Sequence, residues 1–142
     1  MENMPGNVHE LRPKTADSEK ITINLGYVDL GHIDLLVREG FYSNRTDFIR
    51  TAIRNQLDHQ TDAVKQSVAR HQLDIGLHQY SRQDLEAVRS AGEMLHVQVL
   101  GLAVIAADVS PELARATIAS VQVLGALQAS AAVKAALSER IG

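Results

Sequence analysis

The chain has 142 residues, of which 45% are hydrophobic and 22% charged, a composition that supports one or two small packed domains and excludes an intrinsically disordered chain. It contains no cysteine, which excludes disulfide scaffolds, iron–sulfur clusters and cysteine-rich zinc modules. The net charge of -3 argues against generic electrostatic binding to nucleic acid, which usually leaves a basic surface.

We expect no secretory signal in the N-terminal residues. Residues 1–18 are polar, contain Pro5, Gly6 and Pro13 and have no apolar run, so we interpret them as a flexible arm. The longest mostly apolar stretch of the chain, Met94 to Ala107, falls short of the roughly 20 residues that a membrane-spanning helix needs. We therefore expect a cytoplasmic protein with no membrane partner.

Residues 20–25 alternate strictly between polar and aliphatic side chains, which predicts a β-strand with two different faces. The aliphatic face consists of Ile21, Ile23 and Leu25. The polar face consists of Lys20, Thr22 and Asn24. Two helices are predicted to follow, one from a cap at Asp29 to Glu39 with a stop at Gly40, and one from a cap at Ser43 to Leu57.

A single six-residue strand followed by two helices leaves both strand edges without backbone partners in one chain. We therefore expect a two-fold homodimer in which the two strands pair antiparallel and pack their aliphatic faces on four helices. The predicted dimer core contains Ile21, Ile23, Leu25, Ile33, Phe48, Ile49 and Ile53.

The outward face of such a two-stranded ribbon suits the major groove of double-stranded DNA. Lysine donates to guanine, asparagine makes a paired contact with adenine, and threonine serves either base. The start of the second helix offers free backbone N–H groups, to which Ser43, Asn44 and Arg45 add polar groups, so this turn is a candidate phosphate site.

Residues 20–57, with this strand and the run GFYSNRTDFIR at 40–50, resemble the ribbon-helix-helix family of CopG type. The resemblance implies an obligate dimer that acts in a bacterium or archaeon, associated with the nucleoid, as a transcriptional repressor, antitoxin or plasmid-maintenance protein. It also implies a base-reading role for Lys20, Thr22 and Asn24. The implied phosphate clamp consists of Ser43, Asn44 and Arg45.

The C-terminal half contains an internal repeat. The residues VQVLG occur at 97–101 and again at 121–125, and each copy precedes a predicted helix, at Pro111 to Ala119 and at Ala131 to Arg140. A diverged earlier unit runs from Ile75 to Tyr80 and continues as a helix from Arg82 to Ala91, with Ser81 and Ser110 as helix caps. Two or three such units rarely bury both faces of a sheet alone, so we expect self-association through this half.

The predicted fold class is therefore α+β. A ribbon-helix-helix dimer module with one strand and two helices per chain precedes a small α/β module of repeated strand–helix units. The predicted domains are the arm at 1–18, a DNA-binding and dimerisation domain at 19–58, a connecting helix at 59–70 that continues the preceding helix, and an oligomerisation, effector or partner-binding module at 71–142.

The leading hypothesis is a sequence-specific transcriptional regulator, a repressor that binds operator DNA as a dimer or higher oligomer. The alternatives are an antitoxin or assembly protein whose C-terminal module binds a partner protein, a filament-forming protein, and a metal-responsive regulator that uses His71, His78 and His96. The sequence has no phosphate loop, nucleophile elbow or metalloprotease motif, and we expect no enzymatic activity and no cofactor.

Overall fold

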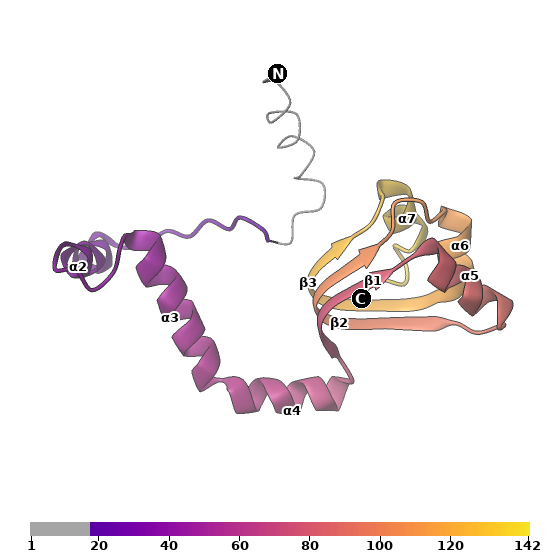
Figure 1. The fold of residues 1–142 in the computed structure, drawn as a ribbon, viewed down its shortest axis with the longest axis horizontal. Coiled ribbons are helices and arrows are strands. Elements are labelled where there is room, and N and C mark those ends of the chain that lie inside the picture. Colours follow the sequence, from indigo (N-terminus) through magenta and orange to yellow (C-terminus); the bar gives the residue numbers. More distant parts are fainter. Residues whose placement is uncertain (1–17) are drawn as a thin grey trace, which may run out of the picture. The chain divides into compact units, whose positions relative to one another are not determined.

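The computed structural model describes residues 18–142, so the predicted arm lies outside the described residues apart from Ser18 (Figure 1). The chain divides into two compact units between Gln60 and Thr61. The described residues have an α+β fold, with helices and a three-stranded parallel sheet. No helix within this range is long and apolar enough to cross a membrane. The predicted domain boundaries stay predictions.

The first unit carries two helices, α2 (Tyr27–Arg38) and α3 (Arg45–His59). A glycine in the left-handed region follows α2, because Gly40 has a φ of 89°. The amide of Gly40 donates to the Val37 carbonyl, and the amide of Phe41 donates to the Leu36 carbonyl. This Schellman arrangement confirms the predicted helix stop at Gly40.

Both predicted helix caps in the first unit are wrong. Helix α2 begins after Gly26, and Asp29 lies in its first turn, where the helix dipole also favours a carboxylate. Helix α3 begins after Asn44, whose Oδ1 accepts the amide proton of Asp47 at 2.8 Å. Asparagine and serine cap helices about equally well, so residue type alone does not separate Asn44 from Ser43.

The second unit contains four helices and three strands: α4 (Thr61–His71), β1 (Asp74–Tyr80), α5 (Arg82–Ser90), β2 (Leu95–Ile105), α6 (Pro111–Thr117), β3 (Ile118–Gln128) and α7 (Ala131–Ala136). The predicted continuous helix through 58–70 is wrong, because α3 ends at His59 and α4 begins at Thr61. Thr61 and Asp62 are residue types that favour the first positions of a helix over its interior.

The three strands are parallel and lie in chain order, and a helix joins each strand to the next. The register of β2 and β3 places each residue of the first VQVLG copy opposite its counterpart in the second, from Val97 and Val121 to Gly101 and Gly125. The two copies of the predicted repeat therefore lie side by side in the sheet, in register with one another.

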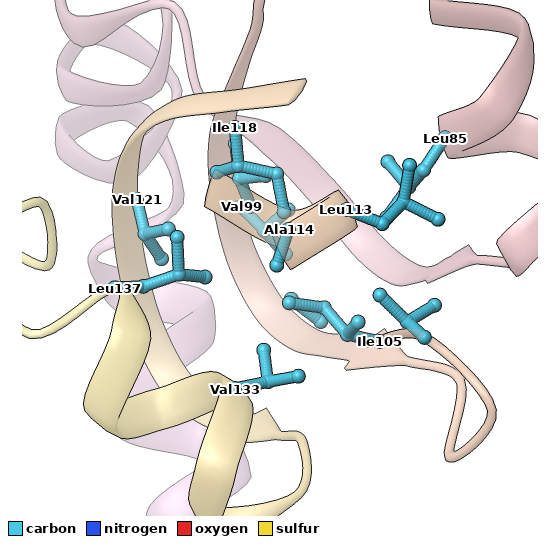
Figure 2. Packing of buried hydrophobic residues seen from close by; sticks show 12 residues of the cluster. Leu85, Val99, Ile105, Leu113, Ala114, Ile118, Val121, Val133 and Leu137 are labelled. Carbon is cyan, nitrogen blue, oxygen red and sulfur yellow. The ribbon is translucent and has the colours of Figure 1, made fainter. Parts of the chain in front are cut away.

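The hydrophobic core lies between the sheet and helices α5, α6 and α7. Four residues of β2 at alternating positions are buried, namely Val97, Val99, Ala103 and Ile105, and the other residues of the strand are half-buried or exposed. Each helix contributes apolar side chains to the same cluster (Figure 2). The labelled members are Leu85, Val99, Ile105, Leu113, Ala114, Ile118, Val121, Val133 and Leu137.

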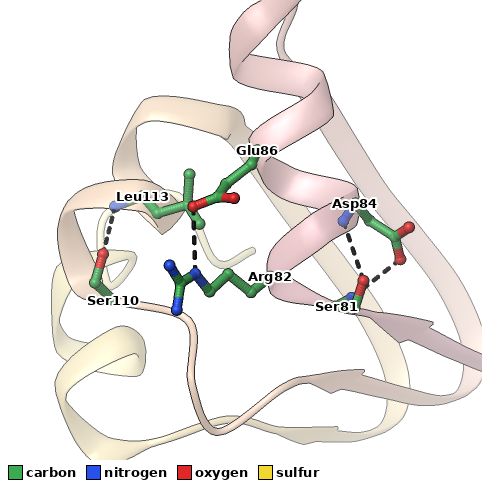
Figure 3. A network of polar contacts seen from close by, with 6 residues as sticks. All are labelled: Ser81, Arg82, Asp84, Glu86, Ser110 and Leu113. Carbon is green, nitrogen blue, oxygen red and sulfur yellow. Dashed lines mark hydrogen bonds and ion pairs between the residues drawn. The ribbon is translucent and has the colours of Figure 1, made fainter.

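Serine caps begin the three helices that cover the sheet. Ser81 and Asp84 form a capping box at α5, in which the Asp84 amide donates to Ser81 Oγ at 3.0 Å (Figure 3). Ser110 Oγ accepts the Leu113 amide at 3.1 Å, and Pro111 opens α6. The two predicted caps at Ser81 and Ser110 are therefore confirmed.

Two predicted helices are too long at their C-terminal ends. Helix α6 ends at Thr117 rather than Ala119, because Ile118 is fully buried and starts β3. Helix α7 ends at Ala136 rather than Arg140, because the following residues pair with β3. The Val121 amide donates to the Arg140 carbonyl, and the Gly142 amide donates to the Val121 carbonyl, both at 2.8 Å. Tertiary pairing overrides helix propensity at both ends.

A row of glycines crosses the sheet. Gly76, Gly101 and Gly125 lie opposite one another, with φ values of 119°, 138° and 122°. A Cβ on Gly101 would come within 3.0 Å of the Gly76 carbonyl oxygen, and one on Gly125 would come within 3.0 Å of the Gly101 carbonyl oxygen. A Cβ on Gly76 would meet open space, because each Cβ in the row points toward the preceding strand and no strand precedes β1 in the sheet. Gly101 and Gly125 are thus required for space as well as for conformation.

The row of glycines leads to a stability prediction for two matched alanine variants. Gly76→Ala should cost only the unfavourable φ, which is about 1–3 kcal/mol. Gly101→Ala should destabilise the second unit by clearly more, because the methyl group also collides with a neighbouring backbone carbonyl. Urea unfolding followed by circular dichroism measures both, and equal losses for the two variants would contradict the close approach.

Candidate nucleic-acid interface

Residues 18–26 lead into α2 without regular secondary structure (Figure 1). Within the described residues, no backbone hydrogen bond connects the segment 20–25 to another segment. All side chains of the segment are exposed, including Ile21 at 72% and Ile23 at 58%. The strand predicted at residues 20–25 is therefore not formed in the single chain, where the segment has neither a neighbouring strand nor a covered aliphatic face.

The first unit leaves most of its apolar surface uncovered. Ile33 is the only buried side chain between residues 18 and 60. Phe48 and Ile49 are half-buried, and the edge of the Phe48 ring meets Tyr42 with 5.0 Å between ring centroids. Ile53 is 47% exposed. A small unit that leaves so many apolar side chains exposed is typical of a chain that associates with another protein surface.

The predicted phosphate-binding turn is ordered by its own polar groups. Asn44 Oδ1 accepts the Asp47 amide, and one Asp47 carboxylate oxygen accepts the Ser43 amide at 2.9 Å. The structure therefore uses Asn44 as a cap and Ser43 as a backbone donor. Within the described chain, the amides of Arg45 and Thr46 have no acceptor, as is usual for the first residues of a helix.

Arg45 joins α3 to α2 through a bidentate ion pair. Its Nε lies 2.8 Å from one carboxylate oxygen of Asp34, and its Nη2 lies 2.9 Å from the other. The hydrogen bond from Arg45 holds the pKa of Asp34 below its ordinary value of 3.8, and the same pair raises the pKa of Arg45. Sequence patterns do not indicate this partner, because the two residues are 11 positions apart on different helices.

The structure thus brings together Ser43, Asn44 and Arg45 in one turn. A family model described as the Ribbon-Helix-Helix transcriptional regulator family matches residues 16–134. The chain belongs to this family. No curated protein and no solved structure matches the chain.

Membership in the ribbon-helix-helix family makes the chain a transcriptional regulator. The match extends well beyond residues 20–57, where the sequence resemblance lies, and includes α4 and all three strands of the sheet. The strand–helix repeats are therefore part of the architecture that this family model describes.

The ribbon-helix-helix chain does not bring the three predicted histidine ligands together. The register places His78 of β1 opposite Ala103, seven residues along β2 from His96, and His71 ends α4. Among residues 18–142, no group of three or more histidine, aspartate or glutamate side chains is arranged to hold a metal ion.

The Arg45–Asp34 pair makes a titration prediction. The pKa of the Asp34 carboxyl should lie below 3.8 in the native chain and rise toward that value in Arg45→Met. Because the folded-state pKa is lowered, the stabilisation by this pair is complete above pH 3.8 and is lost as the pH falls through the lowered pKa. NMR titration of the carboxyl carbon measures the shift, and an unchanged pKa in Arg45→Met would contradict the pairing.

Proposed function

We propose that this chain is a repressor that binds operator DNA as a homodimer and reads the major groove with a two-stranded antiparallel ribbon. Each protomer contributes residues 20–25 to the ribbon. The ribbon places Ile21, Ile23 and Leu25 on the helices of both protomers, together with Ile33, Phe48, Ile49 and Ile53. DNA in the cytoplasm of a bacterium or archaeon is the proposed partner.

The observation that carries this proposal is the uncovered segment before α2. The chain is a member of the ribbon-helix-helix family. Its segment 20–25 has exposed aliphatic side chains at alternate positions and no backbone partner among the described residues. An antiparallel partner strand satisfies both needs at once, because it supplies the hydrogen bonds and brings a second aliphatic face to the same core.

The opposite face of the proposed ribbon presents Lys20, Thr22 and Asn24 twice, once from each protomer. These side chains are exposed in the single chain. Asparagine and lysine pair with adenine and guanine edges in the major groove, which gives the ribbon its proposed sequence preference. Only one of the three residue types is charged, so we expect modest affinity per dimer and a gain from binding of several dimers to repeated half-sites.

The first turn of α3 is the proposed phosphate contact. The amides of Arg45 and Thr46 and the dipole of the helix favour an anion at this end. The Ser43 hydroxyl and the Asn44 side chain lie in the same turn. Asp34 accepts from Nε and Nη2 of Arg45, so the guanidinium is held in place while its remaining N–H donors can reach a phosphate oxygen.

The base-reading role is tested by Asn24→Ala. The variant should remain a dimer and lose its sequence preference, by about 1–3 kcal/mol of discrimination at each contacted base pair. Sequencing of DNA selected from a random library measures the preference. The matched control is Asn55→Ala, which makes the same change at an exposed position of α3. A variant at Asn24 with full specificity would overturn the assignment of the ribbon face.

The dimer is tested by a pair of glutamine variants at neighbouring positions. Ile23→Gln should raise the dimer dissociation constant at least about 100-fold, because each dimer loses two buried isoleucines worth about 1.5–3 kcal/mol each. Thr22→Gln changes the outward face and should leave the dimer intact. Light scattering over a dilution series measures both, and equal behaviour of the two variants would argue against the ribbon.

A further inference from the structure

The second unit has a sheet face that no helix covers. Helices α5, α6 and α7 pack on the face formed by Val97, Val99, Ala103 and Ile105. The residues between them in β2, and their partners in β1 and β3, point away from that core. We define the open face by two aliphatic rows that run across the strands: Ile75, Leu100 and Leu124, then Leu77, Leu102 and Ala126.

We propose that the open face is covered by the open face of the other protomer in the same dimer. This inference rests on the proposed ribbon, which holds the two copies together. It goes beyond the ribbon, because it assigns a second dimer contact to the strand–helix repeats.

The exposure of the open face shows that it needs a cover. Ile75 is 60% exposed, Leu77 58% and Leu124 55%, and all three lie in the two rows. Parallel sheets have both faces covered in almost all proteins. These fractions fall within the range of 38% to 72% shown by the aliphatic side chains in residues 20–25, which are the proposed core of the ribbon.

The chemistry of the face suits a copy of itself. The sole charged strand residue is Asp74, which lies opposite the helix-facing Val99, so the strands place no charge on the open face. Gln98 and Gln122 lie beyond one end of the aliphatic rows, and Gln79 and Gln128 beyond the other. A two-fold axis through the centre sets aliphatic rows against aliphatic rows and amides around them, with no like charges in contact.

The size of the face explains why the partner belongs to the same dimer. The three strands overlap along the seven residues of β1, and this part of the sheet covers roughly 23 Å by 14 Å, or about 320 Å² per protomer. A stable interface between independent proteins needs about 800 Å² per partner. The open face is therefore too small to associate alone, whereas a ribbon that links two copies raises their effective concentration to the millimolar range.

Thiol accessibility in the full chain tests the proposal. The chain has no cysteine, so Leu77→Cys or Leu124→Cys introduces a single reactive thiol on the open face. The matched control is Ala87→Cys, an exposed position on α5. A face that is closed nine-tenths of the time reacts about tenfold more slowly with a maleimide, which corresponds to about 1.4 kcal/mol.

We expect this protection for both open-face thiols in the dimer, and its loss when Ile23→Gln is added to separate the protomers. The Ala87→Cys thiol should react at the same rate in both backgrounds. Protection should also persist on dilution for as long as light scattering reports a dimer.

Two results would overturn the face contact alone. Rapid reaction of the open-face thiols in an intact dimer would show that the other protomer does not cover the face. Protection that disappears on dilution while the dimer persists would place the contact between dimers. A native chain that is monomeric at all concentrations would overturn both the ribbon and the face contact, so the two failures are distinguishable.

Discussion

Residues 20–25 have no backbone partner in their own protomer, and the proposed dimer of the first unit depends on this constraint. Backbone groups at a strand edge must be paired, and three aliphatic side chains on one face must be buried. Helices α2 and α3 bury only Ile33 by themselves. In the proposed dimer, folding of this unit and formation of the DNA-reading surface are therefore the same event.

Much of this architecture follows from local patterns in the sequence. The VQVLG repeat marks strands β2 and β3, and the serines before α5 and α6 mark where those helices start. Such features depend on neighbours within a few residues, so a single sequence is enough to recognise them. The family match confirms the resemblance that rests on the strand and the turn after Gly40.

Sequence patterns do not predict the features that depend on tertiary contacts. The bidentate pair between Asp34 and Arg45 links two helices, and nothing in either residue's neighbourhood indicates it. The early end of α7 arises because the residues after it pair with Val121. The choice between Ser43 and Asn44 as the cap of α3 depends on how the turn packs, since both residue types are good caps. The roles of Lys20, Thr22 and Asn24 stay predictions.

The glycine row has a consequence for how the length of this chain can vary. Successive glycines of the row are separated by 25 residues and then by 24, yet the strands remain in register across all three positions. The close approach of the backbones therefore sets the alignment, and the crossover between strands absorbs the difference. Related chains should accordingly tolerate insertions and deletions in the segments between strand and helix, and whole repeats should be gained or lost without disturbing the remaining sheet.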